Sequence, residues 1–181
     1  MTTLKLAGLC GSLRRESFNR KLLHEAVRHF GDCEFTLVET RFSVFDEDIE
    51  KGEGIPKEVQ AAAEAIAAAD AVIIASPEYN QSVSGVMKNA LDWISRTEGN
   101  PWLRKPVAIM SANAGRSGGA RGQYALRLCL APFRPLMVPG PEVLIAAPGK
   151  EFGEDGRLQN ELYEKALSDL MGELRTAAER K

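Results

Sequence analysis

The stretch LKLAGLCGSLRRESFN, residues 4–19, decides the fold of this chain. An apolar run at residues 4–9 ends in Gly11-Ser12, and apolar residues at helical spacing then continue to Phe30. An apolar run, a short polar loop and a helical pattern, in this order, predict the strand, loop and helix that open an α/β domain.

The loop between the strand and the helix is rich in groups that bind anions. Its hydroxyl and amide donors are Ser12, Ser17 and Asn19, and its cations are Arg14 and Arg15. Backbone N–H groups at a helix N-terminus attract anions, and charge-assisted hydrogen bonds strengthen the binding. The pattern predicts a phosphate site, with a solvated first turn capped by serine as the alternative.

The kind of phosphate follows partly by exclusion. A Walker A loop needs Gly-Lys-Ser/Thr, and no lysine follows Gly11 until Lys21. The dinucleotide pattern G-x-G-x-x-G is absent because Gly8 and Gly11 stand alone. A loop of hydroxyl groups without a glycine run suits a terminal phosphomonoester, the group that FMN carries.

Composition indicates one globular domain over residues 1–181. The net charge of −2 argues against non-specific nucleic-acid binding. There is no apolar run of about 18 residues, and the segment before the first strand does not read as a signal peptide, so we expect no membrane span. Cys10, Cys33 and Cys129 lack metal-ligand spacing, which favours a reduced, cytoplasmic protein.

Apolar runs alternate with helical patterns along the rest of the chain. We expect strands at residues 4–9, 34–39, 71–75, 106–111 and 143–147, helices at 22–30, 56–69, 82–97, 119–130 and 158–174, and an acidic surface loop at 42–54. This order predicts a doubly wound parallel sheet. Ligands bind beyond the carboxyl ends of such strands, which brings loops 11–19, 76–82 and 111–119 together.

The loop at residues 76–82 leaves the central strand of the predicted sheet. Pro77 fixes a turn, Tyr79 offers a flat face to a ring system, and Asn80 can hydrogen-bond the edge of a heterocycle. Ser82 is the expected N-cap of the next helix. The alternative is a polar turn with one exposed tyrosine.

The loop at residues 111–119 contains three glycines among mostly small residues. Such a loop lets a planar ligand approach the backbone closely, and its amides can meet the pyrimidine edge of a flavin. A flexible surface loop is the alternative.

Together these segments resemble the NADPH-dependent FMN reductase family, a flavodoxin-like group that includes quinone and chromate reductases. The matching stretches are Gly11-Ser12-Leu13-Arg14 with Ser17 and Asn19, Pro77-Glu78-Tyr79-Asn80 with Ser82, residues 85–93 with Ser95-Arg96, and Gly118-Gly119 with Arg121 and Gln123. The resemblance covers roughly residues 5–147. It implies a flavodoxin-like three-layer α/β/α sandwich, a five-stranded parallel sheet of order 2-1-3-4-5, and non-covalent FMN.

The resemblance also implies roles for residues of the three loops. The phosphate and ribityl end of FMN would be held by Ser12, Arg14, Ser17 and Asn19. The isoalloxazine would lie along Pro77, Glu78, Tyr79 and Asn80 with Ser82 close by, and its pyrimidine end would be flanked by Ser111, Gly115, Ser117 and Gly118. The candidate proton or charge partners are Tyr79, Glu78 and Arg116; no catalytic side chain is required, because the flavin carries the redox chemistry.

In similar proteins the helix at residues 82–97 lies at a dimer interface beside the flavin, and tetramers form as pairs of dimers. The resemblance therefore implies a homodimer or homotetramer with Trp93 and Arg96 at the interface. An ordinary core tryptophan beside a solvated arginine is the alternative.

These features favour an NAD(P)H oxidoreductase with bound FMN. NADPH or NADH would reduce the flavin and leave, and a quinone, free flavin, chromate or azo compound would then accept two electrons in a ping-pong cycle. A flavodoxin-like electron carrier without NAD(P)H-dependent activity is one alternative, although carriers tend to be strongly acidic around the flavin. A flavin-free protein on the same scaffold is the other. The sequence shows no His, Cys and carboxylate cluster that suggests a metal.

Overall fold

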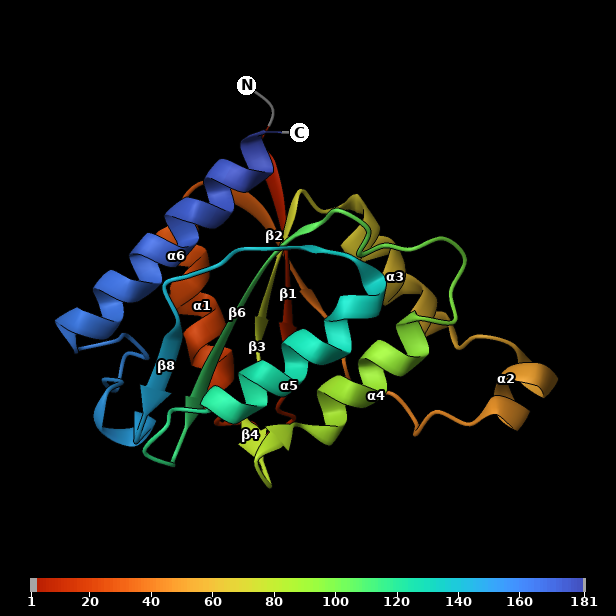
Figure 1. Ribbon diagram of the computed structural model, residues 1–181, viewed down its shortest axis with the longest axis horizontal. Coiled ribbons are helices and arrows are strands. Elements are labelled where there is room, and N and C mark those ends of the chain that lie inside the picture. Colours follow the sequence, from red (N-terminus) through yellow and green to blue (C-terminus); the bar gives the residue numbers. More distant parts are fainter. Residues whose placement is uncertain (1–2, 181) are drawn as a thin grey trace.

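The computed structural model describes residues 3–180, and its centre is a parallel β-sheet with helices on both faces (Figure 1). The strands of the sheet are β1 (Leu4–Cys10), β2 (Cys33–Val38), β3 (Ala71–Ala75), β6 (Pro106–Asn113), β7 (Leu136–Met137) and β8 (Val143–Ala146). Their order is β2-β1-β3-β6, with β7 and β8 both paired to β6 and all pairs parallel. The doubly wound architecture and the order 2-1-3-4-5 expected from the sequence are confirmed.

Two segments share the fifth position of this sheet, where the sequence predicts a single strand. β7 pairs with Pro106 and Val107 at the start of β6, and β8 pairs with residues 110–113 at its end. Pro139 and Pro141 lie between the two segments and have no N–H to donate, so the ladder is interrupted there. A strand as short as β7 shows no readable alternation in the sequence.

Helices complete the three layers (Figure 1). One face of the sheet is covered by α1 (Phe18–Phe30) and α6 (Glu161–Glu179), and the other by α3 (Lys57–Ala68), α4 (Gly85–Ile94) and α5 (Ala120–Leu130). Short 3₁₀ turns follow α5 at Ala131–Phe133 and β8 at Pro148–Lys150. No helix within residues 3–180 is both long and apolar enough to span a bilayer.

Each face of the sheet buries its own apolar cluster. Along β1, Leu6 packs toward α1 and α6, whereas Leu9 packs toward α3 and α4. Ile73 and Ile74 of β3 alternate in the same way, and every residue of β3 is buried. A continuously apolar strand is what a central position, covered on both faces, requires.

The expected loop at residues 42–54 contains a helix, so that prediction was wrong. α2 (Glu47–Glu53) begins after Asp46, whose side chain accepts a hydrogen bond from the Asp48 N–H, and ends at Gly54 with φ 81°. None of its residues is buried, so no apolar stripe marks the helix in the sequence. Its caps and the acidic residues of its first turn stabilise it instead.

The segment after β3 forms a hairpin before the next helix begins. β4 (Glu78–Tyr79) pairs antiparallel with β5 (Ser82–Val83), and the turn between them is Asn80 and Gln81, with φ 49° and 63°. The hairpin projects beyond the carboxyl ends of the central strands (Figure 1).

The hairpin moves the start of α4 to Gly85. Its N-cap is Ser84, whose Oγ accepts a hydrogen bond from the Met87 N–H at 3.2 Å. The predictions that Ser82 caps this helix and that the helix spans residues 82–97 were therefore wrong. Val83 fits the apolar stripe of the helix, but the structure uses it in the antiparallel pair with Glu78.

Trp93 is a core residue, which corrects its implied place at an interface. Its side chain is fully buried, and its Nε1 donates to the Ser43 carbonyl oxygen at 2.8 Å. Its ring meets that of Phe45 edge to face, with centroids 5.0 Å apart. Arg96 lies on the surface, where its Nε is 2.9 Å from Glu50 Oε1. Both residues thus hold the 42–54 segment against α4.

Candidate functional site

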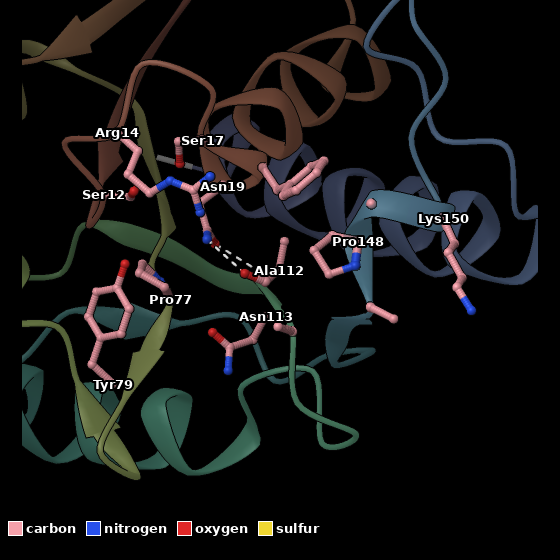
Figure 2. A pocket seen from close by; sticks show the side chains of 14 residues that line it. Ser12, Arg14, Ser17, Asn19, Pro77, Tyr79, Ala112, Asn113, Pro148 and Lys150 are labelled. Atoms are coloured by element: carbon pink, nitrogen blue, oxygen red, sulfur yellow. Dashed lines mark hydrogen bonds between the residues drawn. The ribbon is translucent and has the colours of Figure 1, made fainter.

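A cavity of about 430 Å³ opens where the carboxyl ends of β1, β3, β6 and β8 meet (Figure 2). Its volume is within the range usual for small-molecule sites, about 300–1,000 Å³. The residues that line it are Ser12, Arg14, Ser17, Phe18, Asn19, Pro77, Tyr79, Ala112, Asn113, Ala114, Ala147, Pro148, Gly149 and Lys150. The three loops singled out in the sequence meet here, and a fourth loop, residues 147–150, joins them.

One wall of the cavity is a cradle of hydroxyl groups at the start of α1. Ser12 and Ser17 are 5% and 3% exposed, and Ser17 caps the helix by accepting a hydrogen bond from the Arg20 N–H at 3.4 Å. The first turn of α1 carries no acidic residue, so the positive end of the helix dipole is uncompensated. Arg14 adds an exposed guanidinium on the same side (Figure 2). This wall suits an anion.

Close approach of β1 to its neighbours positions this cradle. A Cβ atom added to Gly11 would lie 2.2 Å from Ser76 Oγ and 2.9 Å from Ser84 Oγ. Those two hydroxyl groups are 3.2 Å apart and within hydrogen-bond distance. Glycine is therefore required at the end of β1 for the loops after β1 and β3 to meet.

Asn19 lines the cavity but uses its side chain to hold the protein together. Its Nδ2 donates to the Ala112 carbonyl oxygen at 2.8 Å, and its Oδ1 accepts from the Ala112 N–H at 3.0 Å (Figure 2). This pair ties the start of α1 to the end of β6. One N–H of the amide remains for a ligand.

The opposite wall is flat and more open. Pro77 and Tyr79 come from the loop and hairpin after β3, and Tyr79 is 48% exposed. Asn113 lies near them, on the side of the cavity away from Ser17 (Figure 2). Its Oδ1 accepts from the Glu78 N–H at 3.2 Å, which leaves Nδ2 as a free donor at the wall.

Several residues that the resemblance assigns to the flavin lie beside the cavity without lining it. Glu78 accepts a hydrogen bond through Oε2 from the Gly122 N–H at 3.0 Å, close to the N-terminus of α5. Asn80 is at the tip of the hairpin, and Ser82 is exposed on β5. Their contacts with a flavin stay a prediction.

The loop after β6 is folded around a buried serine. Ser111 Oγ donates to the Gly118 carbonyl oxygen at 2.6 Å and accepts from Gln123 Nε2 at 2.9 Å. Gly118 has φ 59° and packs so closely on β8 that an added Cβ would lie 2.5 Å from the Leu144 carbonyl. Gly115 and Ser117 are exposed in the same loop. Their contacts with a flavin are untested as well.

Part of the lining has no counterpart among the residues named from the sequence. Phe18, whose ring stacks on Phe152 at 5.8 Å, and the turn at residues 147–150 form the third side. The rule that carboxyl ends of parallel strands meet at one edge applies to β8 too, and could have identified this turn. Phe18 and Pro148 carry no polar group that would distinguish them from core residues.

No group of three His, Cys, Asp or Glu side chains that could hold a metal ion occurs within residues 3–180. The polar groups of the cavity are hydroxyls, amides and the cations Arg14 and Lys150.

Comparison with known proteins identifies relatives of the chain. Residues 4–149 match the NADPH-dependent FMN reductase family. An NAD(P)H-dependent FMN reductase of Pseudomonas aeruginosa is 40% identical over 157 residues, which cover 86% of this chain and 84% of that protein. A quinone reductase of Escherichia coli is 38% identical over 144 residues, which cover 78% and 77%.

A solved structure shows the same architecture. FerB, a flavoenzyme NAD(P)H:acceptor oxidoreductase of Paracoccus denitrificans, matches with a TM-score of 0.88 and 30% identity. The match covers 98% of each chain.

Proposed function

The chain belongs to the NADPH-dependent FMN reductase family, and we propose that it transfers a hydride from NADH or NADPH, through bound FMN, to a small acceptor such as a quinone. One observation carries the proposal: a single cavity joins a buried hydroxyl cradle, suited to a phosphate, to an open and flat-walled half. This is the division that a phosphorylated ring cofactor with one accessible face needs.

The donors of the cavity fit FMN group by group. Ser12, Ser17 and Arg14 would hold the phosphate, since buried hydroxyls and a guanidinium form short, charge-assisted hydrogen bonds to phosphate oxygens. Asn19 would offer its remaining N–H near the ribityl chain. When bound, FMN supplies the chemistry of accepting and donating a hydride.

The flat half of the cavity would receive the ring. Pro77 and Tyr79 would lie beside it. The Asn113 amide is oriented by the hydrogen bond that its Oδ1 accepts from the Glu78 N–H, and its Nδ2 would donate to a ring acceptor. The remaining proposed contacts come from the hairpin and the loop after β6: Glu78, Asn80, Ser82, Ser111, Gly115, Ser117 and Gly118. Tyr79, which lines the cavity and is exposed, would exchange a proton or stabilise charge at the open face.

The charges around the cavity favour an oxidoreductase over an electron carrier. Arg14 and Lys150 line it, and Arg116 is exposed in the loop after β6. Carriers dock partner proteins through acidic surfaces, whereas cations attract a small anionic reductant such as NADPH. Coenzyme and acceptor would use the same open face in turn, as a ping-pong cycle requires.

We also propose that copies of the chain associate through the exposed side of segment 82–97 and the adjoining face of α5. Tyr124 and Leu128 lie one turn apart on α5 and are 59% and 77% exposed. Large apolar side chains grouped on a surface mark interaction sites. A homodimer or homotetramer would cover them.

The proposal includes a cytoplasmic location and one domain over residues 1–181. Cys10, Cys33 and Cys129 are free thiols, the state that a reducing compartment maintains.

Steady-state rates of NADH and NADPH oxidation test the proposed function. The FMN-loaded protein is assayed with a quinone, free FMN, chromate and an azo dye, and we expect turnover with at least one of them and parallel double-reciprocal lines. FMN binding without coenzyme oxidation would support the carrier, and a folded protein that takes up no FMN would support the flavin-free alternative.

A further inference from the structure

A second cavity, of about 180 Å³, lies behind the loop that forms the hydroxyl cradle. Its lining includes Cys10, Leu13, Arg20, Glu39, Thr40 and Arg41. The loop at residues 10–14 separates it from the candidate FMN site, because Ser12 and Arg14 line that site while Cys10 and Leu13 line this one. The cavity is thus at the ends of β1 and β2.

One side chain that lines this cavity, Arg20, carries a nitrogen without a hydrogen-bond partner. Arg20 Nε is buried and has no hydrogen-bond partner. Within residues 3–180, the other buried side-chain nitrogen in that condition is Trp102 Nε1, which lies in the apolar core beside Phe133. An unpaired guanidinium N–H is costly to bury, so the half-buried Arg20 side chain, which lines the cavity, gains from an anion bound there.

The charges of the cavity indicate an anion. Arg20 and Arg41 contribute two guanidinium groups, and Arg41 is exposed where the cavity opens. Glu39 is the one acidic residue of the lining, and its Oε1 already accepts from the N–H groups of Thr40 and Arg41 at 2.8 and 2.6 Å. The Thr40 hydroxyl donates to the Cys10 carbonyl oxygen at 2.9 Å. A net positive charge remains for a ligand.

The volume of the cavity and its two arginine side chains indicate which class of anion it binds. The cavity is smaller than the usual 300–1,000 Å³ or so of sites that enclose a whole small molecule. Arginine pairs recognise phosphate through forked hydrogen bonds. We propose that this cavity binds a phosphate group through Arg20 and Arg41, supplied either by the 2′-phosphate of NADPH or by free phosphate.

The position of Arg41 favours the coenzyme as one source. Arg41 follows β2, at the same carboxyl edge of the parallel sheet as the candidate FMN site, where ligands of such sheets bind. The coenzyme source rests on the proposed function. The phosphate site itself does not.

Two arms of one experiment test the site with Arg41→Gln, Arg20→Met and the control Arg180→Gln, which removes an exposed arginine at the far end of α6. In the first arm, inorganic phosphate is titrated into FMN-saturated protein and the Tm is followed. A saturable rise in the wild type and the control that is lost in both site variants supports binding of free phosphate.

In the second arm, KM is measured for NADPH and NADH in phosphate-free buffer. A KM for NADPH raised about tenfold in Arg41→Gln, with the KM for NADH unchanged and phosphate competing with NADPH alone, supports the 2′-phosphate. Wild-type behaviour of both site variants in both arms overturns the proposal. A wild type that binds no FMN contradicts the proposed function instead, and the first arm, run without FMN, still decides the phosphate site.

Discussion

The side chain of Asn19 and the backbone of Ala112 exchange two hydrogen bonds, 2.8 Å from Nδ2 to the carbonyl oxygen and 3.0 Å from the N–H to Oδ1. Both residues are buried, and they are 93 positions apart in the chain. The pair fixes the cradle at the start of α1 relative to the flat wall that begins at the end of β6. Asn19 is thus a positioning residue for the whole cavity.

Replacing Asn19 by alanine tests this role. Asn19→Ala leaves a buried N–H and a buried carbonyl oxygen of Ala112 without partners, so we expect a loss of about 2–4 kcal/mol in the free energy of unfolding, measured with urea. Gln60→Ala, which removes an exposed amide from α3, should cost under about 0.5 kcal/mol. Equal stability of the two variants would show that the pair does not hold the elements together.

Gly11 offers a second test of how the loops meet. An alanine Cβ would collide with Ser76 Oγ at 2.2 Å, so Gly11→Ala should lower the free energy of unfolding by about 1–3 kcal/mol and weaken FMN binding. Gly52 on α2 has open space around it, and Gly52→Ala should be neutral or stabilising by up to about 1 kcal/mol. Thermal unfolding of both variants compares them; a Gly11→Ala protein as stable as Gly52→Ala would argue against the close approach.

His29 makes stability depend on pH. Burial, together with the neighbouring Arg28 guanidinium, lowers its pKa from the ordinary value of 6.5. The unfolded chain therefore binds a proton more readily than the folded one as the pH falls below about 6.5. The free energy of unfolding should be highest above that pH and fall as the pH drops toward the folded-state pKa.

Urea unfolding at several pH values between about 8 and 5 checks this expectation. His29→Gln should show a shallower decline than the wild type, because it removes one group whose protonation favours the unfolded chain. Identical slopes for the two proteins would exclude His29 as a source of the pH dependence.

The exposed face of α5 predicts the behaviour of the protein in solution. Leu128→Glu places a charge in the proposed contact between copies and should weaken association at least about tenfold. Light scattering during gel filtration measures the mass. Leu162→Glu, an equally exposed leucine on α6, is the control and should leave the mass unchanged. Unaltered assembly of Leu128→Glu would remove α5 from the interface.

The parallel sheet could be predicted from the sequence because its central strands are continuously apolar and covered on both faces. Elements without such a signal could not. α2 has no buried residue, β7 is too short to alternate, and Val83 fits both a helical stripe and the hairpin that it joins. The burial of Trp93 depends on its contacts with Phe45 and Ser43. These two residues lie just before α2, the helix that the sequence pattern does not reveal.

The residues of the candidate site could be predicted where the residue type itself indicates a binding role. Ser12, Arg14, Ser17, Pro77 and Tyr79 all line the cavity. That the Asn19 amide is occupied by Ala112 could not be predicted, because it depends on how α1 is placed relative to β6. Pro148 and its turn carry no chemical signal, and only the position of β8 in the sheet places them there.

The central claim is that the hydroxyl cradle holds the phosphate of FMN, and a fluorescence titration of FMN into the Arg14→Ala/Ser17→Ala double variant tests it most directly. Loss of a guanidinium and a buried hydroxyl should weaken FMN binding by about 2–4 kcal/mol relative to the wild type, while riboflavin, which lacks the phosphate, should bind both proteins equally. An unchanged FMN affinity in the folded double variant would contradict the account.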